Sequence, residues 1–301
     1  MSLADRAIAG EVRAAARLMR IADDRTGDYI QEMVKIWAHT GHARIIGITG
    51  APGSGKSTLT DALITHYRSL GKSVGVAAVD PSSPFSGGAI LGDRIRMATH
   101  ANDEGVFIRS VATRGHLGGL SVSAMDIAAI FDAMGKDIII IETVGVGQDE
   151  VDISSLADTC IVVVMPGAGD DIQAIKAGIL EVADIFVVNK ADRDGADRTA
   201  RDLKTMLELG AKRVWMPPVV KTIALKKSGI EELAEGIALH SNYSDNEDKH
   251  FARLYHAALG LLKDRLVNSC FTPDRFRELL KTQGDPYSVT IKWLKNHGLE
   301  A

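Results

Sequence analysis

Gly50-Ala51-Pro52-Gly53-Ser54-Gly55-Lys56-Ser57 fits the phosphate-binding pattern G-x-x-x-x-G-K-[ST] at every fixed position. An apolar run at Ile45–Ile48 precedes it, and a stretch with helical spacing follows it as far as Gly71. The apolar positions of that stretch share one side of the expected helix: Leu59, Leu63, Tyr67 and Leu70. Glycines let the backbone curl so that successive N–H groups and the helix N-terminus point at an anion. We predict a strand, loop and helix that bind a nucleoside triphosphate.

The residue types of this loop have separate tasks. Lys56 can reach the β- and γ-phosphates, and the Ser57 hydroxyl can ligate Mg²⁺. The residues predicted to bind the nucleotide phosphates are Gly50, Ala51, Pro52, Gly53, Ser54, Gly55, Lys56, Ser57 and Thr58.

The composition is that of a globular protein. The chain has 301 residues, of which 46% are hydrophobic and 25% are charged, so it can bury a substantial core. Its formal net charge of −4 gives no electrostatic reason to expect nucleic acid. No apolar run approaches the ~20 residues of a membrane span, the N-terminus lacks a secretory apolar region, and the two cysteines form no ligand-spaced pair. We expect a soluble, cytoplasmic protein that binds neither nucleic acid nor membrane.

Short apolar runs recur along the chain, at residues 45–48, 74–79, 106–111, 138–141, 161–165, 185–188 and 214–220. Stretches with helical spacing separate most of them, such as residues 122–134 and 196–209. Strands that are buried on both faces and alternate with helices indicate a mostly parallel, doubly wound sheet. We predict an α/β fold of the P-loop NTPase type, with its core domain over residues 44–240.

Both ends of the chain have helical patterns. In the N-terminal extension, residues 1–43, four apolar side chains follow the spacing i, i+3, i+4, i+7: Ile30, Met33, Val34 and Trp37. Within residues 241–301, six side chains form one apolar stripe: Phe251, Leu254, Tyr255, Ala258, Leu261 and Leu262. The C-terminal helices either cover the core or form a dimerisation arm, and these residues alone favour neither.

A second signal follows the apolar run at 185–188, where Asn189-Lys190-Ala191-Asp192 fits the pattern N-K-x-D. A loop at a strand end can place the Asp192 carboxylate against the N1–H and 2-amino groups of guanine. Adenine has neither donor there and would leave a buried carboxylate unpaired. We predict that Asp192 selects guanine, that Asn189 braces the loop and that the Lys190 stem lies over the base.

A third signal is the acidic residue that ends the apolar run at 138–141. Glu142, with Gly145 three residues later, occupies the position that senses Mg²⁺ and the γ-phosphate in such folds. The residue is Glu instead of the more common Asp, and its longer side chain can hold Mg²⁺ through a water or orient a water itself. Gly145 can offer its N–H to the γ-phosphate. We assign no catalytic role to Gln148.

Two further segments carry candidate switch residues. Asp80 ends the apolar run at 74–79, and Asp93 follows the glycine-rich stretch after it. Either could bind Mg²⁺ or activate the attacking water, and either could be an ordinary loop aspartate. The segment Pro166–Lys176 has glycines that permit rearrangement. A helix N-terminus with acids in its first turn explains that segment equally well.

The chain closely resembles the MeaB/ArgK-type GTPases, whose human relative is the MMAA protein. Five segments carry the resemblance: G-A-P-G-S-G-K-S-T, D-P-S-S-P-F-S-G-G-A-I-L-G-D-R-I-R-M, T-R-G-H-L-G-G, E-T-V-G-V-G-Q and P-G-A-G-D-D-I-Q-A-I-K. It spans about Arg44–Leu239 and is weaker in both helical ends. The resemblance implies a dimeric P-loop GTPase of the metallochaperone type. Such proteins bind adenosylcobalamin-dependent acyl-CoA mutases, typically methylmalonyl-CoA mutase; they gate cofactor loading and protect or reactivate the mutase.

The resemblance also implies roles for the candidate residues. It makes 80–97 switch I, 142–148 switch II and 166–176 switch III, where Lys176 matches a lysine implicated in partner-stimulated hydrolysis. The catalytic candidates are then Lys56, Asp80, Asp93, Glu142 and Lys176, and the candidate Mg²⁺ ligands are Ser57, Asp80, Asp93 and Glu142. One departure is Thr222-Ile223-Ala224-Leu225, where a serine-containing turn often contacts the guanine. Backbone N–H groups of Ile223, Ala224 and Leu225 could still make that contact.

These inferences predict a homodimeric GTPase that hydrolyses GTP to GDP and phosphate with Mg²⁺. Hydrolysis would be slow alone, because no arginine finger is obvious, and faster with the mutase, to which the adenosylcobalamin belongs. Residues 241–301 would form the dimerisation arm. The alternatives are a chaperone of isobutyryl-CoA or 2-hydroxyisobutyryl-CoA mutase, a nickel or cobalt inserter, a transport-system kinase and a non-catalytic scaffold.

Overall fold

The computed structural model describes residues 1–80, 98–112, 119–143, 153–154, 156–167, 181–210, 214–243, 246–266, 271–283 and 285–297. The chain divides into two compact units, residues 1–254 and 255–301. The first unit contains the sheet and the segments that carry the predicted nucleotide site.

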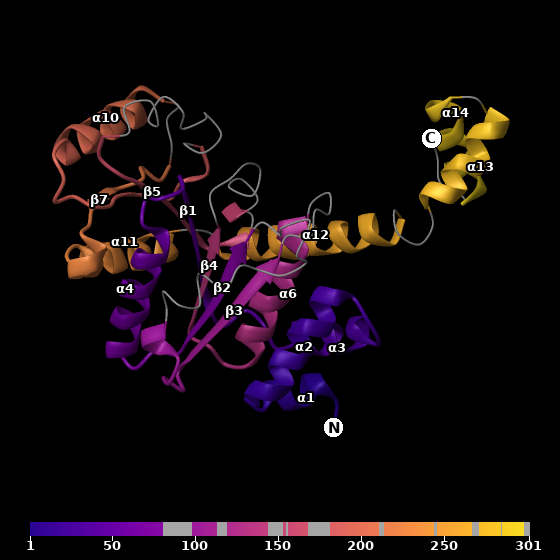
Figure 1. Cartoon of the computed structure of the whole chain (residues 1–301), viewed down its shortest axis with the longest axis horizontal. Helices are drawn as coiled ribbons and strands as arrows, with labels where there is room; N and C mark the ends of the chain where they lie inside the picture. The colour runs from indigo at the N-terminus through magenta and orange to yellow at the C-terminus, as the bar shows by residue number, and fades with distance from the viewer. Residues whose placement is uncertain are drawn as a thin grey trace. The chain divides into compact units, whose positions relative to one another are not determined.

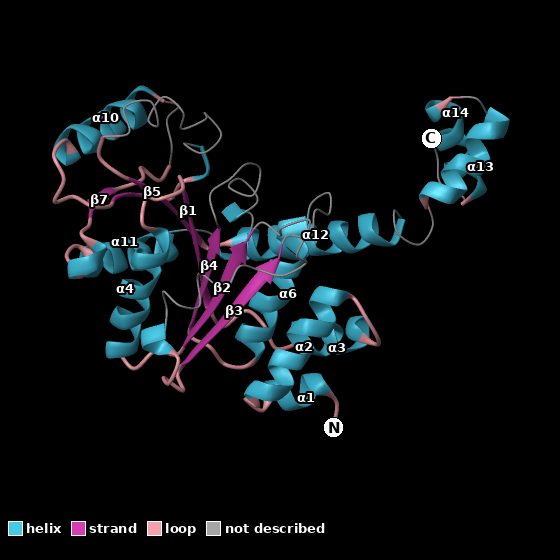
Figure 2. Cartoon of the chain, viewed as in Figure 1, coloured by secondary structure: helices cyan, strands magenta, loops and turns pink. Residues whose placement is uncertain are grey.

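The sheet has seven strands: β1 (Arg44–Gly50), β2 (Val74–Asp80), β3 (Val106–Ala112), β4 (Ile138–Thr143), β5 (Thr159–Val164), β6 (Ile185–Val188) and β7 (Val219–Lys221). Their order is β3-β2-β4-β1-β5-β6-β7, and every neighbouring pair is parallel (Figure 2). The predicted parallel α/β sheet is confirmed. Because β1 lies between β4 and β5, the chain leaves it toward one edge for β2 and later crosses to the other edge for β5. Ligands of open parallel sheets bind at such a switch point, beyond the carboxyl ends of the strands.

Helices cover both faces of the sheet (Figure 1). On one face, α4 (Lys56–Ser69) and α11 (Ile230–Tyr243) share a hydrophobic core with alternate residues of the central strands. On the other face lie α6 (Gly119–Ala133), whose Phe131 packs against Gly75 of β2, and α10 (Ala196–Leu209), which packs against Phe186 and Val188 of β6. Burial on both faces explains why the strand sequences are apolar almost throughout.

The predicted N-terminal extension is helical. It consists of α1 (Leu3–Ile8), α2 (Val12–Asp24) and α3 (Tyr29–Trp37), which contact one another. Helices α2 and α3 also contact α6, so the extension adds a layer over that helix.

The C-terminal region is helical as well, with α12 (Asn246–Arg265), α13 (Pro273–Gln283) and α14 (Pro286–Asn296). In the second unit, α13 and α14 contact each other. Val289 and Trp293 are buried there, and the Phe271 ring meets the Trp293 ring edge-on at 5.2 Å between centroids. None of the helices in the described part of the chain has the length and hydropathy that a bilayer crossing requires.

Two local predictions are wrong. The apolar run at 214–220 forms a strand only from Val219, because Pro217 and Pro218 have no N–H for the ladder, and Val214 is 90% exposed. Leu70 lies beyond the last residue of α4 and is 61% exposed, so it does not belong to the buried side of that helix.

Candidate nucleotide site

The phosphate-binding loop connects β1 to α4 at the carboxyl edge of the sheet, and two of its glycines have no alternative. Gly50 has a φ of 137°, and a Cβ there would lie 2.1 Å from the carbonyl oxygen of Val163 on β5. Gly55 has a φ of 95°, and its Cβ would lie 2.3 Å from Nδ2 of Asn189. Positive φ disfavours a side chain and close packing excludes one, so both positions require glycine.

Lys56 is folded over this loop. Its side chain is buried, and its Nζ donates to the carbonyl oxygens of Gly50 at 2.7 Å and Ala51 at 3.1 Å. No side chain of the described residues caps the N-terminus of α4, which begins at Lys56. The charge of Lys56 therefore lies beside the free amides and the positive dipole end of α4. This arrangement binds phosphate.

Glu142 joins β4 to the first turns of α4. It lies at the carboxyl end of β4, in register with Ile48 of β1, and its side chain is 5% exposed. Ser57 donates its hydroxyl to Oε1 at 2.6 Å, and Thr60 donates to Oε2 at 2.8 Å. The carboxylate therefore has a hydroxyl donor on each oxygen.

The pair Ser57 and Glu142 has the chemistry that Mg²⁺ requires. A hydroxyl can donate its proton to the carboxylate and still present a lone pair to a cation. Mg²⁺ is usually held by one or two protein oxygens together with substrate phosphates and water, not by a cage of protein ligands. Within the described ranges no group of three or more His, Cys, Asp or Glu side chains could hold a metal. The residues thus fit a metal bound jointly with phosphate.

Asn189 connects three loops. Its side chain is 2% exposed, and its Nδ2 donates to the carbonyl oxygen of Ser54 in the phosphate loop at 2.9 Å. Its Oδ1 accepts from the Thr222 hydroxyl at 3.1 Å and from the backbone N–H of Ala224 at 3.2 Å. The phosphate loop, the N-K-x-D loop and the turn at 222–225 are thereby held together by one amide.

The next residues of this loop become more exposed toward Asp192. Lys190 has a φ of 56°, in the left-handed region, and its Nζ donates to the carbonyl oxygen of Gly53 at 2.6 Å. Asp192 has an exposed side chain. The guanine contact expected of this carboxylate stays a prediction.

The turn at 222–225 differs from its prediction in part. The backbone N–H of Ile223 already donates to the carbonyl oxygen of Ser228 at 3.1 Å, and that of Ala224 donates to Asn189. Two of the three backbone N–H groups expected at the guanine thus already donate hydrogen bonds within the protein. Leu225, which is 86% exposed, remains the candidate.

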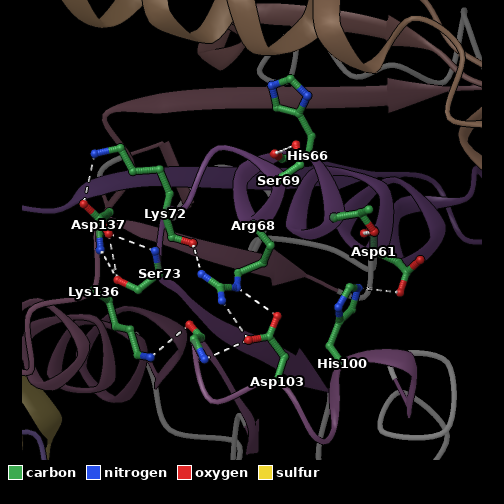
Figure 3. Close-up of polar contacts among 12 residues, drawn as sticks. Asp61, His66, Arg68, Ser69, Lys72, Ser73, His100, Asp103, Lys136 and Asp137 are labelled. Atoms are coloured by element: carbon green, nitrogen blue, oxygen red, sulfur yellow. Dashed lines mark hydrogen bonds and ion pairs between the residues drawn. The ribbon is translucent and has the colours of Figure 1, made fainter.

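Polar contacts hold the far end of α4 to the start of neighbouring strands (Figure 3). Arg68 donates Nε and Nη2 to the carboxylate of Asp103 at 2.8 Å and 2.9 Å, and its Nη1 donates to the carbonyl oxygen of Lys72. Nearer the phosphate loop, Asp61 accepts from the Thr99 hydroxyl at 2.9 Å and pairs with His100 at 3.1 Å. These contacts support the helix that presents Lys56.

Several predicted site residues lie outside the described residues. These are Asp93, Gly145 and Lys176. Asp80 is the last residue of β2, which pairs with β4 beside Glu142 and thus ends at the same sheet edge, but its side chain is not described.

Two contributors to the site were not predicted from the sequence. Thr60 contacts Glu142, and Thr222 contacts Asn189. Only Thr60 had a sequence signal, because it follows Ser57 by three positions and therefore shares its side of the helix.

Comparison with known proteins agrees with this geometry. A sequence model of the family described as "Methylmalonyl Co-A mutase-associated GTPase MeaB" matches residues 16–272. The chain belongs to the MeaB family. A protein from Pyrococcus abyssi is 50% identical over 97% of this chain and 95% of its own length. The GTPase ArgK of Escherichia coli is 39% identical over 76% of this chain and 72% of its own length.

A solved structure agrees as well. The crystal structure titled LAO/AO transport system kinase covers 98% of this chain and 96% of its own chain, with a TM-score of 0.71 and 26% sequence identity. The MeaB-family chain is a P-loop GTPase that binds guanine nucleotide and hydrolyses GTP, and the resemblance found in its sequence is confirmed.

Proposed function

We propose that this GTPase uses Mg²⁺ and acts as a homodimeric chaperone of an adenosylcobalamin-dependent acyl-CoA mutase, with methylmalonyl-CoA mutase as its partner. In this proposal GTP hydrolysis gates the loading of adenosylcobalamin into the mutase and protects or reactivates it. The nucleotide state of the GTPase is the signal, and the cobalamin belongs to the mutase.

The phosphate chemistry rests on residues of this chain. Lys56 and the first-turn amides of α4 offset the negative charge of the phosphates. Ser57 supplies a hydroxyl ligand to Mg²⁺, and Glu142 orients that hydroxyl. When bound, Mg²⁺ neutralises charge that develops on the β- and γ-phosphates. Asp80 and Asp93 stay candidates for the metal and for the attacking water, and Lys176 stays a candidate for partner-stimulated hydrolysis.

The observation that carries guanine selection is the bridge made by Asn189. It fixes the start of the N-K-x-D loop against the phosphate loop, and the exposed Asp192 follows three residues later in the same loop. Guanine has two N–H donors for that carboxylate and adenine has none, so ATP would leave the charge unpaired.

The partner and the dimer rest on different support. The matched family carries mutase association in its description. Helix α12 carries large apolar side chains that are exposed, among them Leu254 at 41% and Leu262 at 60%. A stripe of this kind on one helix is typical of a surface that another protein covers, and a second copy of the chain is the occupant we propose.

The test compares GTP with ATP as substrate, with and without purified methylmalonyl-CoA mutase. We expect release of free phosphate from GTP, faster with the mutase, and little turnover of ATP. Equal turnover of ATP contradicts guanine selection. If methylmalonyl-CoA mutase does not change GTP hydrolysis but an isobutyryl-CoA or 2-hydroxyisobutyryl-CoA mutase accelerates it, the partner is that other mutase.

The structural relative titled as a transport-system kinase suggests a second outcome for the same assay. A kinase transfers the γ-phosphate to a protein acceptor, so radioactive γ-phosphate would appear on protein instead of in solution. We expect it in solution, because the described site has features for phosphate binding and none that is specific to an acceptor.

A further inference from the structure

Thr60 is a fully buried residue one helical turn after Ser57 on α4. Its hydroxyl donates to Oε2 of Glu142 at 2.8 Å, while Ser57 donates to Oε1 at 2.6 Å. Thr60 lies too deep to touch a ligand, because its relative exposure is 0%. Any effect that it has on the nucleotide site must therefore act through Glu142.

The spacing of the two hydroxyls matches the carboxylate. Residues i and i+3 of a helix are neighbours on one side, with Cβ atoms roughly 5–6 Å apart. Ser57 and Thr60 can therefore each take one oxygen of the same carboxylate. The terminal torsion of a glutamate is broad and roughly two-fold, so a hydroxyl donor on each oxygen restricts the rotation of the carboxylate plane more than one donor does.

This arrangement also explains why a glutamate occupies this position. Glu142 lies on β4, which is the neighbour of β1, and β1 leads into α4. The Glu142 carboxylate must therefore reach two successive turns of α4. An aspartate would withdraw the carboxylate by one C–C bond, about 1.5 Å. That shift exceeds the tolerance of hydrogen bonds of 2.6–2.8 Å, so an aspartate could not hold both hydroxyls.

We propose that Thr60 is the positioning residue for Glu142, and that its hydroxyl fixes the carboxylate so that Ser57 presents its oxygen to Mg²⁺. The inference rests on the proposed use of Mg²⁺. Removing partners that orient the ligands of a metal typically weakens metal affinity about 10–100-fold. Thr60 should contribute at the lower end of that range, because it acts through one neutral hydroxyl.

The experiment uses the full chain and two readouts. The first is the affinity for GDP, measured by calorimetry in EDTA and across a Mg²⁺ titration. The second is the Mg²⁺ concentration that half-saturates GTP hydrolysis. Thr60→Val removes the hydroxyl and keeps the shape, and Thr60→Ser keeps the hydroxyl. Thr65→Val is the matched control, because the Thr65 hydroxyl bonds the carbonyl oxygen of Asp61 on the same helix, away from Glu142.

We expect Thr60→Val to raise the half-saturating Mg²⁺ concentration about tenfold while GDP affinity in EDTA stays within about twofold. For Thr60→Ser the half-saturating Mg²⁺ concentration should lie within about threefold of that of the unmodified chain. For Thr65→Val it should equal that of the unmodified chain. Thr60→Val with an unchanged Mg²⁺ dependence overturns the positioning role. So does an equal loss of GDP affinity with and without Mg²⁺, which would mean a distorted phosphate loop.

A second variant covers the case in which Thr60→Val does not fold. Glu142→Asp should raise the Mg²⁺ requirement by at least as much, and Thr60→Ala, which removes the hydroxyl, should then have little additional effect, because the contact is already broken. Full additivity of the two changes rejects the coupling. If the unmodified chain shows no response to Mg²⁺, the proposed metal dependence fails, and the role of Thr60 fails with it. The two failures are thus separable.

Discussion

Replacing Asn189 with alanine removes the side chain that joins the three loops of the nucleotide site. Its three shorter hydrogen bonds disappear, those to the Ser54 carbonyl, the Thr222 hydroxyl and the Ala224 amide, at 2.9, 3.1 and 3.2 Å, together with a long one to the Gly55 carbonyl at 3.5 Å. A net contribution of about 1 kcal/mol for each gives a loss of about 3 kcal/mol in the free energy of unfolding. For a unit of this size that corresponds to a fall of roughly 6–12 °C in the melting temperature.

The matched control is another residue of the same N-K-x-D pattern. Asp192→Ala changes an exposed side chain, so its effect on the free energy of unfolding should stay within about 0.5 kcal/mol. Its effect on selectivity should be large, because a charged hydrogen bond is worth about 1.5–3 kcal/mol, or roughly 10–150-fold in GDP affinity. We therefore expect Asn189 to act on the architecture of the site and Asp192 to act on the base.

Thermal melting and calorimetry on the two variants separate these roles. Asn189→Ala should melt early and bind both GDP and ADP weakly, whereas Asp192→Ala should melt normally and lose its preference for GDP over ADP. A melting temperature for Asn189→Ala within about 2 °C of the unmodified chain would refute the reasoning, because three buried hydrogen bonds cannot be lost at so small a cost.

Three other changes test separate parts of the structure. Lys56→Ala should lower GTP hydrolysis roughly 100-fold, measured as phosphate release, whereas Lys72→Ala, at the other end of α4, should leave it unchanged. Gly50→Ala should lower the free energy of unfolding by at least about 2 kcal/mol, because its Cβ would meet Val163. Gly53→Ala, with a φ of 78° and open space, should cost about half as much. Equal melting temperatures for the two variants would contradict this difference. Burial raises the pKa of Asp126 to about 7, so the folded state holds its proton more tightly than the unfolded chain, and stability falls as the pH rises from about 4 to 7. Asp126→Asn should abolish this loss, so that the variant is the more stable protein at pH 8, which urea denaturation across that pH range will measure.

The features that local sequence specifies could be predicted from it. The glycines and the lysine of the phosphate loop lie within eight positions of one another, and the strands that lead to Glu142 and Asn189 are apolar throughout because helices cover both faces of the sheet. In such a sheet the carboxyl ends of the strands meet at one edge, so strand-end polar residues can be assigned to one site.

Contacts between distant positions could not be predicted in the same way. Asn189 and Ser54 are 135 positions apart, and Glu142 and Thr60 are 82 apart. No local pattern records such a pair, because it depends on which strands become neighbours. The amides of the 222–225 turn illustrate the same limit: Ala224 donates to Asn189, a contact that removes it from the guanine-binding candidates.

The bridge at Asn189 has a consequence for how the site binds its ligand. The Nδ2 atom of Asn189 fills the space where a Cβ on Gly55 would lie, and it holds the Ser54 carbonyl in the next position of the loop. The shape of the phosphate loop is therefore maintained in part by the N-K-x-D loop. A loop held in one shape by such contacts loses less conformational entropy when phosphate binds, and this gain depends on an intact N-K-x-D loop. A nucleotide that fits only the phosphates would not strengthen the link, whereas guanine contacts at Asp192 would stabilise both loops together.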